Sequence, residues 1–165
     1  MFTKIAKPWR YLLPVILTVL LLGGALWARP HMPFWRTSPT QAGVPVGTSD
    51  EINLMARLIA AEATGEPYEG QVAVGAVILN RVRSPLFPST ISGVIYEPWA
   101  FESVHNGLIW QVSDLTTAIN AAVDALNGWD PTYGALFFWN PAKPVSPWMW
   151  TRTVITQIGR HVFAL

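Results

Sequence analysis

The sequence predicts an α+β fold that is mostly helical and carries a small antiparallel β-sheet near its C-terminus. Three observations support this class. Apolar residues recur at helical spacing between residues 50 and 128. Gly65 and Gly128 stand where predicted helices should end. Short apolar runs separated by turn residues follow residue 131, as in β-strands. The stretch from 50 to 165 is long enough to bury a single hydrophobic core.

The first two predicted helices carry most of that core. The first helix begins with a cap at Ser49 or Asp50 and runs to about Thr64. The second helix spans residues 68–83. Its centre, residues 72–79, is apolar on every side, so we expect neighbouring elements to bury it. A glycine within this centre should let the first helix approach closely.

A third helix is predicted to begin at Ser113 or Asp114 and to end at Asn127–Gly128. Before it, residues 90–96 favour a short helix, and residues 97–112 indicate an irregular polar and aromatic stretch. Five residues are expected to form the buried face of the third helix: Leu115, Ile119, Ala122, Val123 and Leu126.

The predicted strands lie at the C-terminal end of the chain. Residues 136–139 favour one strand, which follows a turn at residues 129–131. Residues 153–163 favour two short strands that turn near Gly159, which is the pattern of a β-hairpin. The expected sheet is therefore small and antiparallel.

The N-terminal segment differs from the rest of the chain. Residues 11–28 contain no charged side chain and follow three basic ones, a pattern that predicts a signal peptide or an N-terminal membrane anchor over residues 1–28. Small residues at 23–25 would suit signal-peptidase cleavage, so both alternatives stay open. Residues 29–49 are rich in Pro, Gly, Ser and Thr and predict a flexible tether. Either alternative predicts that residues 50–165 are exported.

Charge and composition exclude several classes of function. The first 49 residues carry five basic side chains and no acidic one, whereas all ten Asp and Glu residues follow, so the folded part is mildly acidic. Binding to nucleic acid is therefore not expected. The chain has no cysteine, and its three histidines are far apart, so we expect neither thiolate chemistry nor a metal site or cofactor.

One carboxylate stands on the apolar face of the first predicted helix. Met55, Leu58 and Ile59 lie seven, four and three residues before Glu62, so they share its helical face. A carboxyl group there should lose water, which raises its pKa and suits it to act as a general acid. The alternative is an ordinary glutamate at a helix end that reaches solvent or pairs with Arg57.

Three blocks carry a resemblance to a known family: AEATGEPYEGQVAVGAVILNRV, SPLFPSTISGVIYEPWAFESVHNGLIW and ALFFWNPAKPVSPWMWTRTVITQIGRHVFA. In this order they resemble the catalytic domain of SleB/CwlJ-type cell wall hydrolases, over residues 52–164. The resemblance implies a lysozyme-like fold, similar to that of lytic transglycosylases, that acts on the glycan strands of peptidoglycan. It also implies that Glu62 is the catalytic glutamate. The corresponding domain would be a cell wall hydrolase catalytic domain over residues 50–165.

The resemblance implies cleavage between N-acetylmuramic acid and N-acetylglucosamine, with Glu62 as general acid and then base, and a 1,6-anhydromuramoyl product. A muramidase-type hydrolase would need a second carboxylate. The candidates for it are Glu66, Glu69, Glu97 and Glu102. Family members often carry a neutral residue in the place of Glu102, which argues against an essential role for it. A non-catalytic glycan-binding or scaffold domain is the remaining alternative, although Glu62 argues against it.

The expected substrate-binding residues are Tyr68, Gln71, Phe138, Asn140 and Trp148. Gln71 opens the second helix, where it could bind substrate, orient Glu62 or merely cap the helix. Asn140 follows a predicted strand, where site loops are common. Prolines at 144 and 147 precede Trp148 and favour an aromatic platform for sugars, whereas Trp139 is expected to pack in the sheet. Asn80 lies on the opposite face of the second helix from Gln71 and is expected to be structural.

The implied partners follow from the same resemblance. They are peptidoglycan glycan strands, the membrane if the N-terminal segment is retained, and an accessory protein of the YpeB kind. The implied location is the outer face of the cytoplasmic membrane, the cell wall or the spore cortex, with a role in cortex lysis during germination.

Overall fold

The computed structural model describes residues 47–165, so the predicted signal or anchor and nearly all of the predicted tether lie outside the described residues. Within the described part, no helix combines the length and the apolar character needed to cross a bilayer. The elements in chain order are α2 (Ser49–Glu62), α3 (Tyr68–Arg83), α4 (Ile91–Ile95), α5 (Glu102–His105), the 3₁₀ helix η3 (Leu108–Trp110), α6 (Thr116–Leu126), β1 (Phe137–Trp139), the 3₁₀ helix η4 (Pro147–Thr151), β2 (Val154–Ile158) and β3 (His161–Ala164).

Helix α2 begins one residue earlier than the sequence predicts. Its cap is Thr48, whose side chain accepts a hydrogen bond from the Glu51 backbone, while the Glu51 carboxylate accepts one from the Thr48 backbone. This reciprocal capping box satisfies two backbone N–H groups that a helix start leaves unpaired. The helix ends at Glu62, and Gly65 (φ 73°) turns the chain as predicted.

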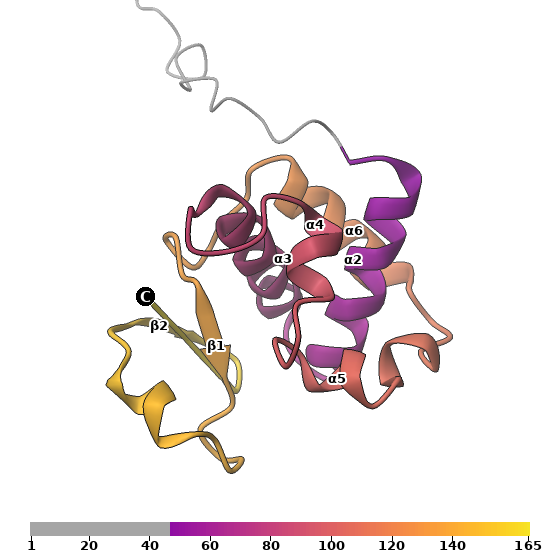
Figure 1. The fold of residues 1–165 in the computed structure, drawn as a ribbon. Helices are drawn as coiled ribbons and strands as arrows, with labels where there is room; N and C mark the ends of the chain where they lie inside the picture. The colour runs from indigo at the N-terminus through magenta and orange to yellow at the C-terminus, as the bar shows by residue number, and fades with distance from the viewer. Residues whose placement is uncertain (1–46) are drawn as a thin grey trace, which may run out of the picture. The chain divides into compact units, whose positions relative to one another are not determined.

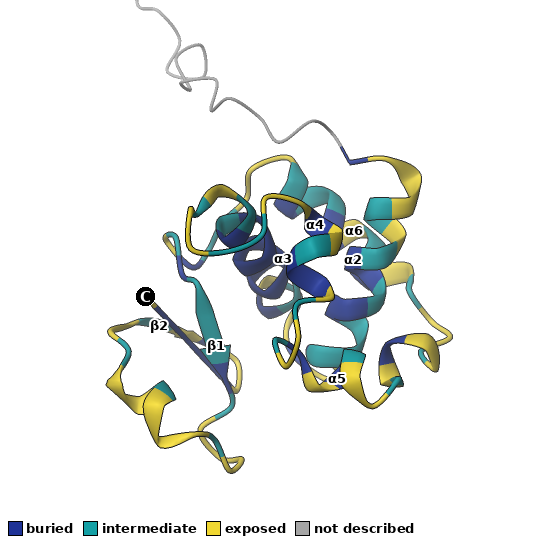
Figure 2. Ribbon diagram, in the orientation of Figure 1, coloured by how far each residue is buried: buried dark blue, intermediate teal, exposed yellow. Residues whose placement is uncertain are grey.

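Helix α3 is the central element of the helical part, and Figure 2 shows it as largely buried. Its residues from Val72 to Leu79 are all buried, as predicted. A Cβ atom placed on Gly75 would lie 3.1 Å from the Cβ of Ala125 in α6 and 3.1 Å from the Cδ1 of Ile59 in α2. The glycine therefore lets two helices, rather than one, approach the α3 backbone closely.

The prediction for the third helix was partly wrong. Helix α6 begins at Thr116 rather than at Ser113 or Asp114, although the Asp114 carboxylate accepts a hydrogen bond from the Thr116 backbone. Its buried residues are Ala118, Ala121, Ala122 and Ala125, whereas Leu115, Ile119, Val123 and Leu126 are only half-buried. Close approach of α3 leaves room for methyl groups alone, so the larger side chains lie at the edges of the contact.

Two short helices occupy the stretch that the sequence indicates as irregular. Helix α5 has four residues, and η3 has three. Gly107 joins them with φ 76°, a left-handed conformation that favours glycine. The buried side chains of Ser103 and Ile109 hold these helices against α2 and its surroundings. The short helix predicted at 90–96 is present as α4.

The sheet has the strand order β1-β3-β2, and both pairings are antiparallel. Strands β2 and β3 form the predicted hairpin, with Gly159 (φ 59°) in its turn. All four residues of β3 are buried, as expected for the middle strand. Figure 1 shows the sheet beside the helical part. Trp139 packs with Val162 and Ala164 on this sheet, as predicted.

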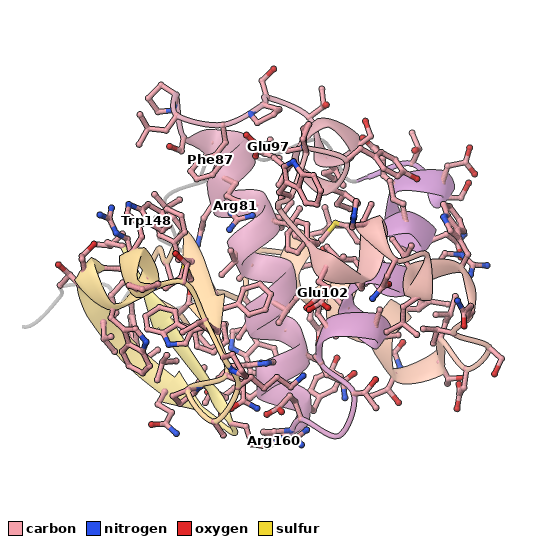
Figure 3. The ribbon with its side chains drawn as sticks, turned by 60° about the horizontal axis from the view of Figure 1, so that its bottom comes forward. Arg81, Phe87, Glu97, Glu102, Trp148 and Arg160 are labelled. Carbon is pink, nitrogen blue, oxygen red and sulfur yellow. The ribbon has the colours of Figure 1, made fainter. Side chains whose placement is uncertain are left out.

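An ion pair joins the sheet to the helices. The Glu66 Oε1 atom accepts a hydrogen bond from Arg160 Nε at 2.6 Å, and its Oε2 atom accepts one from the Arg160 backbone at 2.9 Å. Arg160 also donates to the Thr64 carbonyl at 2.8 Å. Figure 3 shows Arg160 where the hairpin meets the loop after α2. Glu66 is a candidate for the second catalytic carboxylate, but both of its carboxylate oxygens are bound by Arg160, so its role here is structural.

A second connection fixes the loop that leads into β1. The Asp130 carboxylate accepts hydrogen bonds from the Thr132 hydroxyl, the Gly134 backbone and the side chain of Asn80. Burial by itself raises the pKa of Asp130, but these hydrogen bonds lower it below its usual value. Asn80 is thus structural, as predicted.

Candidate active site

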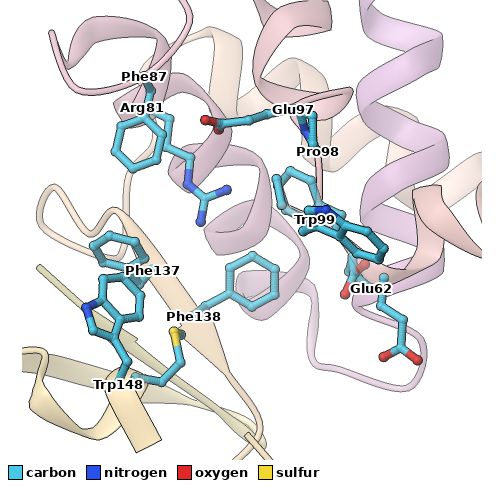
Figure 4. Close-up of a pocket in the computed structure, with 13 residues that line it drawn as sticks. Glu62, Arg81, Phe87, Glu97, Pro98, Trp99, Phe137, Phe138 and Trp148 are labelled. Carbon is cyan, nitrogen blue, oxygen red and sulfur yellow. The ribbon is translucent and has the colours of Figure 1, made fainter. Parts of the chain in front are cut away.

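A cleft of about 290 Å³ opens where the C-terminal end of α2 faces the sheet. Residues 97–102 form one wall, β1 with η4 form the opposite wall, and Arg81 of α3 and Phe87 also line it. Figure 4 shows Glu62 at one end of this cleft and Phe137 with Trp148 across it. The cleft brings together three of the predicted site residues: Glu62, Phe138 and Trp148.

Glu62 stands at the last position of α2, with one oxygen held. Its Oε1 atom accepts a hydrogen bond of 2.6 Å from the Ser103 hydroxyl and one of 3.4 Å from the Ser103 backbone. Among the described residues, no donor binds the Oε2 atom. The pairing with Arg57, one form of the alternative to a catalytic role, is not formed, and the Arg57 guanidinium lies over the ring of Trp110 instead.

The environment of Glu62 is less apolar than its helical face predicts. Met55, Leu58 and Ile59 are fully buried, as that face requires. Glu62 is only half-buried, because α2 ends there and the cleft opens beside it. The carboxyl group is therefore positioned by Ser103 and only partly withdrawn from water.

Two of the other four carboxylates also line the cleft. Glu97 is half-buried, and Glu102 is exposed at the start of α5, next to Ser103. Glu69 is exposed on the first turn of α3 and does not line it. For Glu66, burial by itself raises the pKa. The hydrogen bonds from Arg160 and the charges of Arg160 and His161 outweigh this effect, so its pKa is lower than usual.

Aromatic rings line the wall opposite Glu62. Trp148 is 49% exposed and meets Phe137 edge to face, with ring centroids 5.3 Å apart. The Arg152 guanidinium lies 4.3 Å from the centroid of the Trp148 ring and fixes its other side. Phe138 is half-buried beside them. Exposed rings held at fixed positions are suited to stack on sugar rings.

Trp99 is a cleft residue that sequence reasoning did not select. It is 80% exposed, has φ 66° and contacts His105 in a tilted arrangement, with ring centroids 4.3 Å apart. A tryptophan in a left-handed conformation is strained, which is more common at functional positions than elsewhere. The only signal in the sequence was its place after Pro98 in the polar and aromatic stretch.

Arg81 is the second cleft residue that was missed. It is 7% exposed, and its Nε atom donates to the Leu136 carbonyl at 2.8 Å. The rings of Phe87, Phe101 and Phe137 lie 5.1, 5.2 and 5.7 Å from its guanidinium carbon. Burial lowers the pKa of Arg81 to about 10, and the charge of Glu97 partly offsets this effect. The available signal was a charged residue directly after the apolar centre of the helix.

Three predicted substrate-binding residues lie away from this cleft. Gln71 lines a second hollow of about 400 Å³, beside Thr64 and Asp114. The Tyr68 hydroxyl donates to Asp124 at 2.6 Å; this bond and burial raise the pKa of Tyr68 to about 12. Asn140 accepts a hydrogen bond from the Ala142 backbone at 2.9 Å and so shapes its own loop.

The site holds no cluster of side chains suited to a metal ion within residues 47–165. The groups that line the cleft are carboxyl groups, one guanidinium and aromatic rings.

A family model described as Cell Wall Hydrolase matches residues 65–164. The chain therefore belongs to the cell wall hydrolase family, as its sequence blocks indicate. The match begins three residues after Glu62, so the assignment of Glu62 rests on the geometry and on the resemblance described above.

Curated relatives share this part of the chain. The spore cortex-lytic enzyme of Oceanobacillus iheyensis is 55% identical over 121 residues, which are 73% of this chain and 44% of the relative. The enzyme of the same name from Bacillus subtilis is 51% identical over 123 residues, 74% of this chain and 40% of the relative. The chain thus spans less than half the length of these relatives. Cell wall hydrolase CwlJ of B. subtilis is 33% identical, over 70% of this chain and 85% of CwlJ.

Two solved structures share the fold. The catalytic domain of the germination-specific lytic transglycosylase SleB from Bacillus anthracis is 50% identical, with a TM-score of 0.68 over 72% of this chain and 97% of that domain. The catalytic domain of the Bacillus cereus SleB protein is 47% identical, with a TM-score of 0.68 over 78% of this chain and 100% of that domain. These similarities confirm the predicted fold class.

Proposed function

We propose that this chain cleaves the glycan strands of peptidoglycan between N-acetylmuramic acid and N-acetylglucosamine as a lytic transglycosylase. The observation that carries the proposal is Glu62, which presents one free carboxyl oxygen to a cleft walled by aromatic rings. The name of the B. anthracis relative, a germination-specific lytic transglycosylase, supports the same chemistry.

In the proposed reaction, Glu62 acts twice. Its protonated Oε2 atom donates the proton to the glycosidic oxygen, and the bond between that oxygen and C1 of the muramoyl residue breaks. The resulting carboxylate then accepts the proton of the muramoyl 6-hydroxyl as O6 attacks C1. The product is a 1,6-anhydromuramoyl end, and Glu62 is again protonated. Ser103 fixes the carboxyl group so that the same oxygen serves both steps.

A muramidase-type hydrolase is the alternative reaction at the same site. It requires a second carboxylate to activate water or to form a covalent intermediate. Glu97 and Glu102 are the two candidates that line the cleft, whereas Glu66 is held by Arg160. We favour the transglycosylase reaction because it needs Glu62 alone.

The biological setting belongs to the proposal as well. The names of the spore cortex-lytic relatives support a role in cortex lysis during germination. The basic residues before the uncharged stretch 11–28 support export, with this stretch as a cleaved signal or a membrane anchor. Partnership with an accessory protein of the YpeB kind rests on the family resemblance. Terminal sequencing of the exported protein distinguishes cleavage at residues 23–25 from a retained anchor.

The deciding experiment is mass spectrometry of the muropeptides that the full chain releases from purified cortex and vegetative peptidoglycan. Glu62→Gln, which is nearly isosteric and cannot donate the proton, should abolish the anhydromuramoyl products while the far-ultraviolet circular dichroism stays unchanged. Glu69→Gln is the matched control, because Glu69 is exposed outside the cleft, and it should keep full activity.

The other outcomes are equally informative. Reducing-end products that depend on Glu62 would identify a hydrolase and turn attention to Glu97 and Glu102. Substantial activity in Glu62→Gln would disprove the assignment of the acid. Binding to peptidoglycan with no product from either substrate would indicate a glycan-binding module.

A further inference from the structure

The cleft contains a buried positive charge that the proposed reaction does not use. Arg81 is 7% exposed, yet its side chain lines the cleft. Figure 4 shows its guanidinium in the open space between Phe137, Phe138 and Trp99. Because burial of a charge is costly unless polar partners compensate, such a residue calls for an explanation.

Within the described part of the protein, only one of the guanidinium nitrogens of Arg81 has a hydrogen-bond acceptor. The Nε atom donates to the Leu136 carbonyl, which fixes the orientation of the group. Three phenylalanine rings surround the guanidinium. Within residues 47–165, no acceptor binds the two terminal nitrogens, and no carboxylate lies within ion-pair distance. The donors that remain are therefore directed at the cleft, where a ligand oxygen could meet them.

The charges around the cleft indicate which kind of ligand oxygen Arg81 would bind. Glu62, Glu97 and Glu102 all line it, so a ligand carboxylate would enter a region of negative potential. A neutral carbonyl avoids that repulsion and still accepts hydrogen bonds from a guanidinium. Figure 4 shows the Glu97 carboxylate directed toward Arg81, where it could accept the N–H of the same group. A neutral group with a carbonyl and an N–H is a secondary amide.

We infer that Arg81 and Glu97 form a subsite for the acetamido group of an N-acetylated sugar, with Arg81 binding its carbonyl oxygen and Glu97 its N–H. The inference deepens the proposed function and rests on it for the choice of a glycan ligand. The aromatic rings of Phe87, Phe101 and Phe137 would keep water from the guanidinium, which strengthens its hydrogen bonds to the ligand.

The test compares two neutral oligosaccharides with the same backbone. The probes are the β-1,4-linked tetramers of N-acetylglucosamine and of glucose, which has a hydroxyl in the place of each acetamido group. Binding is measured by isothermal titration calorimetry on the full chain carrying Glu62→Gln, so the result is independent of cleavage. The Glu62→Gln chain should prefer the N-acetylated tetramer. Adding Arg81→Gln should reduce this preference at least about tenfold, the effect of losing hydrogen bonds from a charged group.

Two further variants complete the test. Arg83→Gln makes the same change two residues away at an exposed position of α3 and should leave the preference unchanged. Glu97→Ala should reduce the preference about fivefold through loss of a single acceptor. It also decides the question if Arg81→Gln fails to fold by circular dichroism.

The outcomes separate this inference from the proposed function. Equal affinity of the Glu62→Gln chain for both tetramers, or an unchanged preference in folded Arg81→Gln or in Glu97→Ala, would overturn the subsite. If Arg81→Gln loses the preference while the chain that retains Glu62 releases no muropeptides, the subsite is supported and the proposed reaction is refuted. If the chain that retains Glu62 cleaves normally while Arg81→Gln keeps the preference, the proposed reaction is supported and the subsite is refuted.

Discussion

At Glu62, one carboxyl oxygen is bound by the protein and the other faces the cleft. The bound oxygen accepts from the hydroxyl and the backbone of Ser103, a residue that is itself 4% exposed. Hydrogen bonds to a charged acceptor are stronger than neutral ones, so the bond from the Ser103 hydroxyl should be strongest when Glu62 becomes a carboxylate after the first proton transfer. Ser103 is therefore a positioning residue for Glu62.

Ser103→Ala removes the hydroxyl donor and leaves only the backbone donor at 3.4 Å. We expect kcat to fall about tenfold, because one hydrogen bond to a charged group contributes about 1.5–3 kcal/mol and about 1.4 kcal/mol is a factor of ten in rate. KM should hardly change, since Ser103 does not line the cleft. Steady-state kinetics on solubilised peptidoglycan checks this split. Ser92→Ala, at an exposed position of α4, is the control and should keep the kcat of the wild type.

Trp99 combines high exposure with a strained backbone. An L-residue in the left-handed region costs roughly 1–2 kcal/mol, a cost that glycine does not carry. The contact of the indole ring with the His105 ring offsets part of this cost. This combination suggests that the position is kept for the surface that the indole presents to the cleft.

Trp99→Gly and Trp99→Ala separate the strain from the surface. Both variants should lower kcat/KM at least about tenfold, because each removes a large exposed ring beside Glu62. Only the glycine relieves the backbone, so its free energy of unfolding should exceed that of the alanine variant by about 1 kcal/mol. Thermal unfolding of the two proteins measures the difference. An alanine variant as stable as the glycine variant would show that the backbone strain is unimportant.

Between elements, the Glu66–Arg160 pair connects the loop after α2 to the turn between β2 and β3. The two partners differ in environment, since the Glu66 side chain is 2% exposed and that of Arg160 is 59% exposed. Most of the stabilisation should therefore come from keeping the buried carboxylate hydrogen-bonded, rather than from attraction between two exposed charges. Protonation of Glu66 would weaken the connection.

The stability of the domain should consequently decrease in acid through Glu66. The pKa of Glu66 is lower in the folded chain than its ordinary value of 4.5, so the unfolded chain binds the proton first. Its contribution is full above that value and is lost as the pH falls below it and through the folded pKa. Urea unfolding of wild type and Glu66→Gln between about pH 5 and pH 3 tests this. The wild type should show the steeper loss, and parallel curves would contradict the prediction.

For the whole molecule, Gly159 sets how closely the sheet approaches the helices. A Cβ atom at this position would collide with Glu66 Oε2 and lie 2.7 Å from Pro67 Cδ, and φ is 59°. The sheet supplies Phe137 and Phe138 to the cleft, while α2 supplies Glu62. This contact is therefore one of those that set the geometry of the site, together with the Asp130 hydrogen bonds and the bond from Arg81 to the Leu136 carbonyl.

Gly159→Ala should destabilise the domain by about 2–4 kcal/mol, because it adds both a steric overlap and a strained conformation. It should also lower kcat/KM, since the two walls of the cleft would move apart. Gly128→Ala is the control: φ there is 99°, but a Cβ atom would meet nothing within 4 Å. The control should lose only about 1 kcal/mol, and differential scanning calorimetry compares the two. Equal losses would argue against the steric contact.

Much of the fold could be predicted because its signals are local. Apolar spacing and glycine stops predict α2, α3 and the hairpin within a few residues. Helix α5 has four residues, too few for a helical periodicity to be visible in the sequence, and its Ser103 contacts Glu62, 41 residues away in the sequence. The alanine face of α6 was mispredicted because the close approach of α3 is a property of the pair of helices.

The residues of the candidate site likewise fall into those that local sequence patterns predict and those that depend on tertiary contacts. Glu62 follows from its helical face, and Phe138 and Trp148 follow from aromatic residues near a strand. The orientation of Arg81 depends on the Leu136 carbonyl, which is 55 residues away in the sequence. The conformation of Trp99 is likewise a tertiary property. Neither residue could be placed at the site by spacing alone.

The contact between α3 and α6 also restricts how this sequence can change. A Cβ atom placed on Gly75 would lie only 3.1 Å from the Cβ of Ala125, and four alanines form the buried face of α6. Any replacement of the glycine adds atoms, and any replacement of an alanine except by glycine does the same. Almost every substitution at these positions should therefore destabilise the fold. In a saturation library selected for folding, we would expect these positions to show the fewest accepted substitutions, although they contribute nothing to the chemistry.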